Sequence, residues 1–178
     1  IVMSNETSSY RATRYLIDHG HREIGYIAGS YRIRNFPLRE RGWRRAMREA
    51  GLQINPGYRV VVGTKPSTSY TDMLAWLGST QSLPTAFFVE NDIMAFGCMR
   101  ALSERGLKVP DDISLVGFDD LSFATIANPP LTTMHVPNQE MGVMAVQGIL
   151  DQINKPSEYT RVMHIGTVLV ERKSVRQL

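Results

Sequence analysis

In residues 110–120 the chain reads Pro110-Asp111-Asp112-Ile113-Ser114-Leu115-Val116-Gly117-Phe118-Asp119-Asp120. A Pro-Asp-Asp turn leads into a short apolar run that ends at Phe118, and two carboxylates follow directly. Residues 85–89, Thr-Ala-Phe-Phe-Val, form a second continuous apolar run. Runs of this kind, without alternation of polar residues, are typical of parallel strands covered on both faces of a sheet. The two segments therefore predict buried strands of an α/β domain.

Helix-like and strand-like segments alternate along the rest of the chain. Apolar residues at helical spacing predict helices, and short apolar runs between turn signals predict strands. The predicted helices cover residues 7–19, 38–50, 70–77, 92–105 and 138–153. The predicted strands cover residues 23–28, 59–62, 85–89, 113–118, 131–136 and 162–170. This alternation indicates right-handed βαβ units in a Rossmann-like, doubly wound parallel sheet.

Polar segments follow four of the predicted strands. They are residues 30–39, 64–69, 90–92 and 119–120. In a doubly wound sheet, ligands bind beyond the carboxyl ends of the strands. We therefore expect these four segments to carry the function.

Composition and missing motifs exclude several classes of protein. The 178 residues are 43% hydrophobic and 21% charged, as in an ordinary soluble domain, and the single cysteine, Cys98, fits a reducing cytoplasm. No apolar run is long enough to span a membrane. Dinucleotide, P-loop, zinc-protease and nucleophile-elbow motifs are absent, so we expect no enzyme, cofactor or metal. The chain begins at Ile1 without an initiator methionine, and we expect it to be a piece of a longer gene product.

Two charged features each allow two interpretations. Seven arginines lie between Arg32 and Arg48, against Glu40 and Glu49 alone. They indicate either a nucleic-acid patch or, as we favour, a solvated helix face. The Asp119-Asp120 pair after a strand suggests either a magnesium site or, as we favour, a carboxylate that accepts hydrogen bonds from adjacent hydroxyls of a ligand.

Five stretches, taken together in this order and spacing, resemble the lac-repressor (LacI/GalR) family. Each is weak alone, but the ordered set extends along nearly the whole chain. They are residues 12–24 (Ala-Thr-Arg-Tyr-Leu-Ile-Asp-His-Gly-His-Arg-Glu-Ile), 39–43 (Arg-Glu-Arg-Gly-Trp), 84–95 with Pro-Thr-Ala-Phe and Asn-Asp-Ile-Met-Ala, 110–120 as quoted, and 129–133 (Pro-Pro-Leu-Thr-Thr).

This resemblance implies an effector-binding core that is similar to a type I periplasmic binding protein, with two Rossmann-like lobes and a ligand between them. Residues 1–5 would end the N-terminal lobe at the first crossover, and residues 6–134 would form the C-terminal lobe. Residues 135–165 would return to the N-terminal lobe, and residues 166–178 to the C-terminal lobe. Met141, Met144, Ala145, Ile149 and Ile153 would then form a helix face that its own lobe leaves uncovered.

We expect an effector site made of Arg39, Asn91, Asp92 and Asp119, which the resemblance implies, together with Lys65. The alternatives are an ion pair of Arg39 with Glu40 or Glu90 and a helix-start role for Asp92. Family members often place a stacking aromatic in the loop at 64–69, where this chain has Lys65. Phe36 or Tyr31 would replace that ring, or Lys65 would favour an anionic effector. Taken as surface residues, Arg39 and Asp119 are expected to tolerate alanine without loss of folding.

By the same resemblance the chain dimerises through its C-terminal lobe. The expected interface positions are Ala95, Phe96, Met99, Ile126 and Ala127, with packing inside the core as the alternative. The function implied is the sugar-sensing core of a cytoplasmic regulator that contacts operator DNA only through a separate helix-turn-helix head. We expect the chain alone to show no operator specificity. The alternative is a periplasmic-type sugar-binding protein of a transport system.

Overall fold

The computed structural model describes residues 1–31 and 33–178. A six-stranded sheet in the order β3-β2-β4-β5-β6-β8 forms the body of the molecule, and β1 pairs with β7 in a separate two-stranded sheet. The strands are β1 Val2–Met3, β2 Ile24–Gly29, β3 Arg59–Val62, β4 Ala86–Val89, β5 Ser114–Asp119, β6 Thr132–His135, β7 His164–Ile165 and β8 Val168–Val170. The helices are α1 Asn5–Asp18, α2 Asn35–Glu49, α3 Pro66–Ser79, α4 Asp92–Glu104 and α5 Asn138–Asn154.

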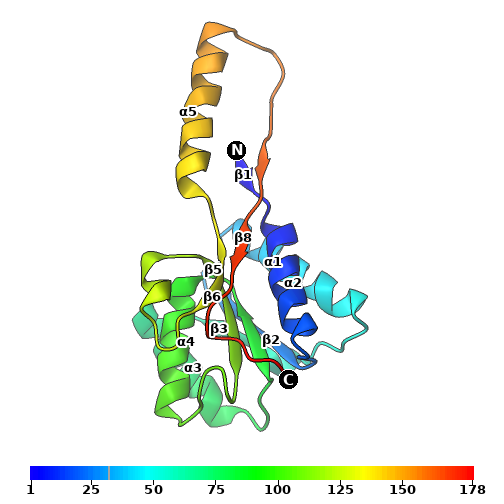
Figure 1. Ribbon diagram of the computed structural model, residues 1–178, viewed down its shortest axis with the longest axis vertical. Coiled ribbons are helices and arrows are strands. Elements are labelled where there is room, and N and C mark those ends of the chain that lie inside the picture. The colour runs from blue at the N-terminus through cyan, green and yellow to red at the C-terminus, as the bar shows by residue number, and fades with distance from the viewer. Residues whose placement is uncertain (32) are drawn as a thin grey trace.

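The body is a sheet between two helical layers, which confirms the predicted doubly wound α/β fold (Figure 1). Successive residues of β4 point to opposite faces of the sheet. Phe87 therefore joins a core cluster with α3 and α4, and Phe88 joins a second cluster that includes Trp43 of α2 and Leu16 of α1. Because both faces are covered, β2 and β4 are buried along their whole length.

The edge strand β8 departs from the predicted all-parallel sheet. It pairs with β6 in the antiparallel sense, with His135 opposite Val168. The prediction of a single strand at residues 162–170 is also wrong. The structure has two short strands there: His164–Ile165 pairs with β1, and Val168–Val170 pairs with β6. The apolar pattern of this segment does not reveal which strand each half contacts.

Helix α3 begins four residues before its predicted start. The loop expected at 63–69 is shorter, because Pro66 opens the helix at a position where its missing N–H costs nothing. The Thr68 hydroxyl accepts a hydrogen bond from the Lys65 backbone N–H at 3.3 Å. The polar residues of this first turn look like a loop in the sequence but serve as a helix start.

Helix α5 and the segment that returns from it stand clear of the body (Figure 1). None of the residues of α5 is buried, and Ile149 and Ile153 are 61% and 67% exposed. Met141 alone of the five predicted face residues packs against the core cluster of α1 and α2. The face is therefore largely uncovered, as expected, while the assignment of residues 135–165 to a second lobe stays a prediction. No helix within residues 1–31 and 33–178 has the length and apolar character needed to cross a membrane.

Candidate functional site

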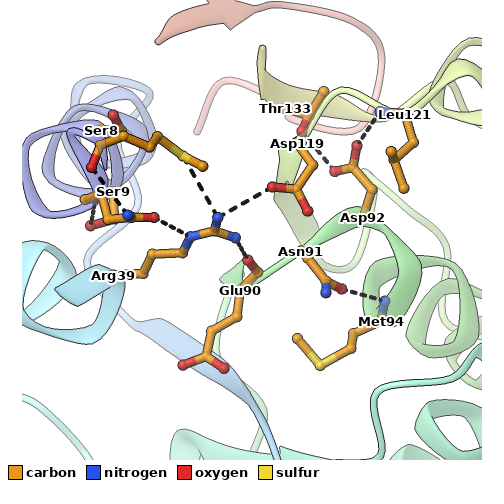
Figure 2. A network of polar contacts seen from close by, with 12 residues as sticks. Ser8, Ser9, Arg39, Glu90, Asn91, Asp92, Met94, Asp119, Leu121 and Thr133 are labelled. Atoms are coloured by element: carbon orange, nitrogen blue, oxygen red, sulfur yellow. Dashed lines mark hydrogen bonds and ion pairs between the residues drawn. The ribbon is translucent and has the colours of Figure 1, made fainter. Parts of the chain in front are cut away.

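The guanidinium of Arg39 lies at the carboxyl ends of β4 and β5, where it joins three elements (Figure 2). Its Nη2 forms an ion pair with Asp119 Oδ1 at 3.2 Å, and its Nε donates to Asn5 Oδ1 at 2.9 Å. Its Nη1 donates to the Glu90 carbonyl oxygen. The guanidinium carbon lies 3.6 Å from the centre of the Phe118 ring, which is a cation–π contact. Arg39 therefore contributes to folding as well as to the site.

Asp119 is the partner of Arg39 that reaches solvent. Its side chain is 28% exposed, whereas that of Arg39 is 3% exposed. Burial raises the pKa of the Asp119 carboxyl, and the nearby Arg39 opposes that rise. Within the described part of the chain, Oδ2 of Asp119 has no hydrogen-bond partner. This oxygen of the partly exposed carboxylate can accept a further hydrogen bond.

The backbone of Asp119 and Asp120 is strained. Both have positive φ, 107° and 54°, which non-glycine residues seldom adopt and which aspartate tolerates better than most. Each such residue costs about 1–3 kcal/mol and persists where the surrounding contacts hold it. The two carboxylates consequently have different partners: Asp119 contacts Arg39, and Asp120 contacts His135 and Arg172.

Glu90 lies in the segment 90–92 that is expected to carry the function, and the sequence offers it as an alternative ion-pair partner of Arg39. It is fully buried, and its carboxylate accepts hydrogen bonds from the Tyr26 hydroxyl at 2.6 Å and the Gly29 N–H at 2.7 Å. Arg39 contacts the Glu90 carbonyl and pairs with Asp119, so the predicted alternative of an ion pair with Glu40 or Glu90 is wrong. The sequence signal for a role of Glu90 is its place as an acidic residue directly after the apolar run at residues 85–89.

Asn91 and Asp92 are engaged within the fold. Asn91 is the N-cap of α4, where its Oδ1 accepts a hydrogen bond from the Met94 N–H at 2.9 Å. Asp92 is fully buried and accepts hydrogen bonds from the Thr133 hydroxyl at 2.7 Å and the Leu121 N–H at 2.9 Å (Figure 2). Asp92 is the first residue of α4, which agrees with the helix-start role considered for it, while Asn91 caps the helix. In the interior of the fold, the Asp92 carboxylate therefore links β6 to the chain after β5.

The loop residues considered for stacking or charge differ in exposure. Lys65 is exposed, and in the described part of the chain no contact links it to Arg39 or Asp119. Phe36 is 3% exposed and belongs to the core cluster with α3 and α4, whereas Tyr31 is 71% exposed. Of the two aromatics considered, Tyr31 is the one with a free ring surface.

The five expected interface residues divide between the core and the surface. Ala95 is fully buried and Met99 is 7% exposed, while the Phe96 ring packs on Phe123 with 4.4 Å between their centres. Ile126 is 82% exposed. Phe96, Met99 and Ala127 line an open hollow of about 470 Å³. Ala95 therefore offers no surface to a partner, and Ile126 offers the largest.

Glutamates pair with several members of the arginine cluster. The solvated-face interpretation fits these described pairs, and Arg32 lies outside the described residues. The pairs are Arg41–Glu6 at 3.1 Å, Arg44–Glu40 at 2.8 Å and Arg45–Glu49 at 2.8 Å. Among residues 1–31 and 33–178, no group of three His, Cys, Asp or Glu side chains is placed to hold a metal ion.

Two buried groups are expected to give opposite pH dependences of stability. Burial lowers the pKa of His21 to about 4, so the unfolded chain binds the proton first and acid destabilises the fold as the pH falls from about 6.5. Burial raises the pKa of Asp92 to about 6, so the folded chain binds the proton first and acid stabilises it below about pH 6.

Urea unfolding between pH 7 and pH 4 tests this expectation in two variants. Relative to the parent, His21→Gln should gain unfolding free energy as the pH falls, and Asp92→Asn should lose it. Each slope is at most about 1.4 kcal/mol per pH unit, the value for one proton. Slopes of the same sign in both variants would contradict the burial argument.

Known proteins that are similar in sequence identify the family to which this chain belongs. Residues 13–175 match the family model described as periplasmic binding protein-like domain. The HTH-type transcriptional repressor PurR of Pasteurella multocida (strain Pm70) is 42% identical over 167 residues, which is 94% of this chain and 50% of that protein. PurR of Histophilus somni (strain 129Pt) is 38% identical over 179 residues, 100% of this chain and 54% of that protein. The chain thus spans about half the length of the curated relatives it matches.

Solved structures agree with these sequence matches. A dimeric Lac repressor superposes with a TM-score of 0.91 at 29% identity and covers 100% of this chain and 64% of that chain. The transcriptional regulator CelR in complex with cellobiose superposes with a TM-score of 0.88 at 28% identity and covers 97% of this chain and 52% of that chain.

Proposed function

Because the chain belongs to the periplasmic binding protein-like domains of the LacI family, we propose that it is the effector-sensing core of a transcriptional repressor. The observation that carries the proposal is the Arg39–Asp119 pair at the carboxyl ends of the strands, where doubly wound sheets bind ligands. The relatives are repressors, so no reaction is assigned to the site. In this proposal the repressor is cytoplasmic, and a separate segment of it contacts operator DNA.

The proposed effector is a small polar metabolite, with sugars and sugar derivatives as the first class. Asp119 accepts hydrogen bonds from adjacent hydroxyls through its free oxygen, and Arg39 holds that carboxylate in place. The superposed CelR structure contains a sugar, cellobiose. Lys65 has no described contact with this pair, which gives little support to an anionic effector.

A thermal-shift screen of the full-length protein tests the proposed class directly. The panel contains sugars, sugar phosphates, nucleosides and nucleobases. A ligand at about 100 times its Kd should stabilise the fold by about 2.7 kcal/mol. Stabilisation by sugars supports the proposed effector class. Stabilisation only by nucleosides or nucleobases would change the effector class but would still support the sensing role. If no small molecule stabilises the protein, the sensing role fails.

Asp119→Asn is expected to weaken binding of the effector found in that screen. Asparagine tolerates the positive φ at this position but lacks the charge that strengthens the hydrogen bonds. The loss should be about 1.5–3 kcal/mol, the range for hydrogen bonds to charged groups. Isothermal calorimetry gives the Kd, and Asp18→Asn, which removes an exposed carboxylate on α1, serves as the control. Equal affinities in both variants would remove Asp119 from the site.

We also propose that the protein is a dimer through the surface around Ile126. This side chain is 82% exposed beside the hollow lined by Phe96, Met99 and Ala127. Placing a charge there would leave it unpaired in an apolar interface. Ile126→Asp is therefore expected to halve the mass measured by light scattering, whereas Tyr159→Asp, at an exposed site in the return segment, should not. A monomeric parent protein at high micromolar concentration would refute the dimer.

Ligand binding is proposed to shift closure of two lobes and thereby the affinity for operator DNA. Such coupling requires that the effector bind one arrangement more tightly than the other. The largely uncovered face of α5 supports the view that a second lobe covers it, since large exposed apolar surfaces usually have a partner.

A further inference from the structure

Three chain segments leave the body at one edge. We call residues 3–5, 135–138 and 165–168 the neck, and residues 138–165, which contain α5 and β7, the arm. The arm stands clear of the six-stranded sheet, and the neck is its connection to the body (Figure 1). Whatever fixes the neck therefore fixes the direction of the arm.

Each neck segment is tied to the Asp119-Asp120 dipeptide or to its partner Arg39. The first is tied by Asn5, whose Oδ1 accepts the Arg39 Nε hydrogen bond at 2.9 Å. The second is tied by His135, whose Nδ1 lies 2.9 Å from Asp120 Oδ2. The third is tied just beyond β8 by Arg172, whose Nη2 donates to Asp120 Oδ1 at 2.7 Å. Two attachments therefore end on Asp120, and the first reaches the neighbouring Asp119 through Arg39.

The two contacts of Asp120 differ in exposure, because the His135 side chain is 45% exposed and the Arg172 side chain is largely buried. The side chains of Asp120 and Arg172 are each 15% exposed, so their ion pair is shielded from water. Arg172 also donates from Nη1 to the Leu131 carbonyl at 2.8 Å, which ties it to the chain entering β6. Because an ionised carboxylate only accepts hydrogen bonds, the His135 Nδ1 carries the proton in its contact with Asp120.

The two aspartates form one strained turn. Both have positive φ, 107° at Asp119 and 54° at Asp120, and the turn holds one carboxylate toward Arg39 and the other toward His135 in the neck. Strained residues of this kind persist only where the surrounding contacts hold them. The contacts of both carboxylates therefore help to hold the same short piece of backbone.

We propose that Asp120, with His135 and Arg172, is a connector that sets the orientation of the arm and transmits changes at Asp119 to the neck. The three are positioning residues and do not touch the effector. The inference rests on the proposed function only in treating Asp119 as the residue that a ligand displaces. The orientation of the arm is measurable without any ligand.

The test measures the distance between spin labels on the body and on the arm of the full chain. Cysteines replace Ser79 of α3 and Val146 of α5, both exposed, while the native Cys98 is fully buried and escapes labelling. The labelled protein is mixed with an excess of unlabelled protein, so that the distances are measured within one copy. The connector predicts a single narrow distance distribution in the parent. It predicts a broader or shifted one in Asp120→Asn, which keeps the backbone tolerance for positive φ but lacks the charge.

Matched variants separate orientation from folding. Arg172→Gln and His135→Gln should change the distribution in the same direction, and Arg172→Lys, which keeps the charge, should give an intermediate result. Arg45→Gln breaks an exposed ion pair of α2 with Glu49 and should leave the distribution unchanged. If Asp120→Asn does not fold, the Arg172 and His135 variants test the connector in its place. Folded variants with the parental distribution overturn the connector.

The transmission step has its own test in the same labelled chain. Asp119→Asn weakens the Arg39 contact, because the asparagine oxygen still accepts a hydrogen bond but carries no charge, and it should shift the distribution. In the Asp120→Asn background the same change should add nothing further, because the connector is already broken. A full shift in that background overturns Asp120 as the route. Neither result depends on an effector, so failure here is distinct from failure of the ligand screen.

Discussion

Arg39→Met is expected to lower the free energy of unfolding by about 3–5 kcal/mol, the range for removing one partner of a buried ion pair. Methionine fills part of the volume and keeps contact with the Phe118 ring, but it donates no hydrogen bond. Asp119, the Asn5 amide oxygen and the Glu90 carbonyl all lose their donor. Urea unfolding monitored by circular dichroism gives the difference in free energy.

Two further variants show whether burial is the cause. Arg45→Met, on the same helix but in an exposed pair with Glu49, should leave stability nearly unchanged. Arg39→Met combined with Asp119→Asn should recover part of the loss, because the carboxylate left without its partner is then uncharged. A loss below about 1 kcal/mol in the single variant, in the range of surface pairs, would contradict the burial of Arg39.

This expectation corrects the one drawn from the sequence, which treated Arg39 and Asp119 alike as surface residues that tolerate alanine. For Arg39 the surface position is wrong, because its side chain is 3% exposed. Any affinity measured on Arg39 variants must therefore be read together with their stability. Asp119, which is partly exposed, is the better probe of the site.

Gly42→Ala is expected to destabilise the protein by about 3 kcal/mol, at the upper end of the range for overpacking. Gly42 lies where α2 crosses α1, and an added Cβ would overlap the Ser9 hydroxyl and the Glu6 carbonyl oxygen and approach the Tyr10 nitrogen to 2.8 Å. Two of these three atoms belong to the backbone, so they yield only if the helices move apart. Separating them would disturb the cluster that contains Trp43.

Gly148→Ala is the matched control, because Gly148 lies inside α5 and an added Cβ would meet nothing within 4 Å. Alanine is favoured over glycine in a helix by about 1 kcal/mol, so this variant should be neutral or more stable. The same substitution thus has opposite signs at the two sites. Thermal unfolding of both variants checks the difference, and a Gly42→Ala protein as stable as the parent would rule out close packing of α1 on α2.

Much of the fold is predictable from local patterns in the sequence. The continuous apolar runs at 85–89 and 113–118 correspond to β4 and β5, and helical spacing finds all five helices to within a few residues at most ends. The strands and helices depend on short-range periodicity, which every segment carries within itself. That Arg39 and Asp119 belong to one site is implied by the resemblance to the lac-repressor family, and the two side chains do lie together at one edge of the sheet.

The roles of polar side chains are less predictable, because their partners are distant in the sequence. Asp92 and Thr133 are separated by 41 residues, and Tyr26 and Glu90 by 64. No local pattern distinguishes a carboxylate that faces a crevice from one that braces the strands from within. The sequence therefore places Asp92 in the site by resemblance and does not reveal that the side chains of Asp92 and Glu90 are both buried.

Local patterns along the chain specify the order of helices and strands, the burial of the central strands and the edge of the sheet where ligands are expected, because hydrophobic periodicity specifies which faces leave water. The burial of Arg39 against Asp119, the antiparallel direction of β8 and the contacts of Asp120 with His135 and Arg172 are visible only in three dimensions. Those outcomes depend on contacts between residues up to 80 positions apart. Long-range contacts are fixed by packing and by the need to pair buried polar groups, which the spacing of residues along the chain does not encode.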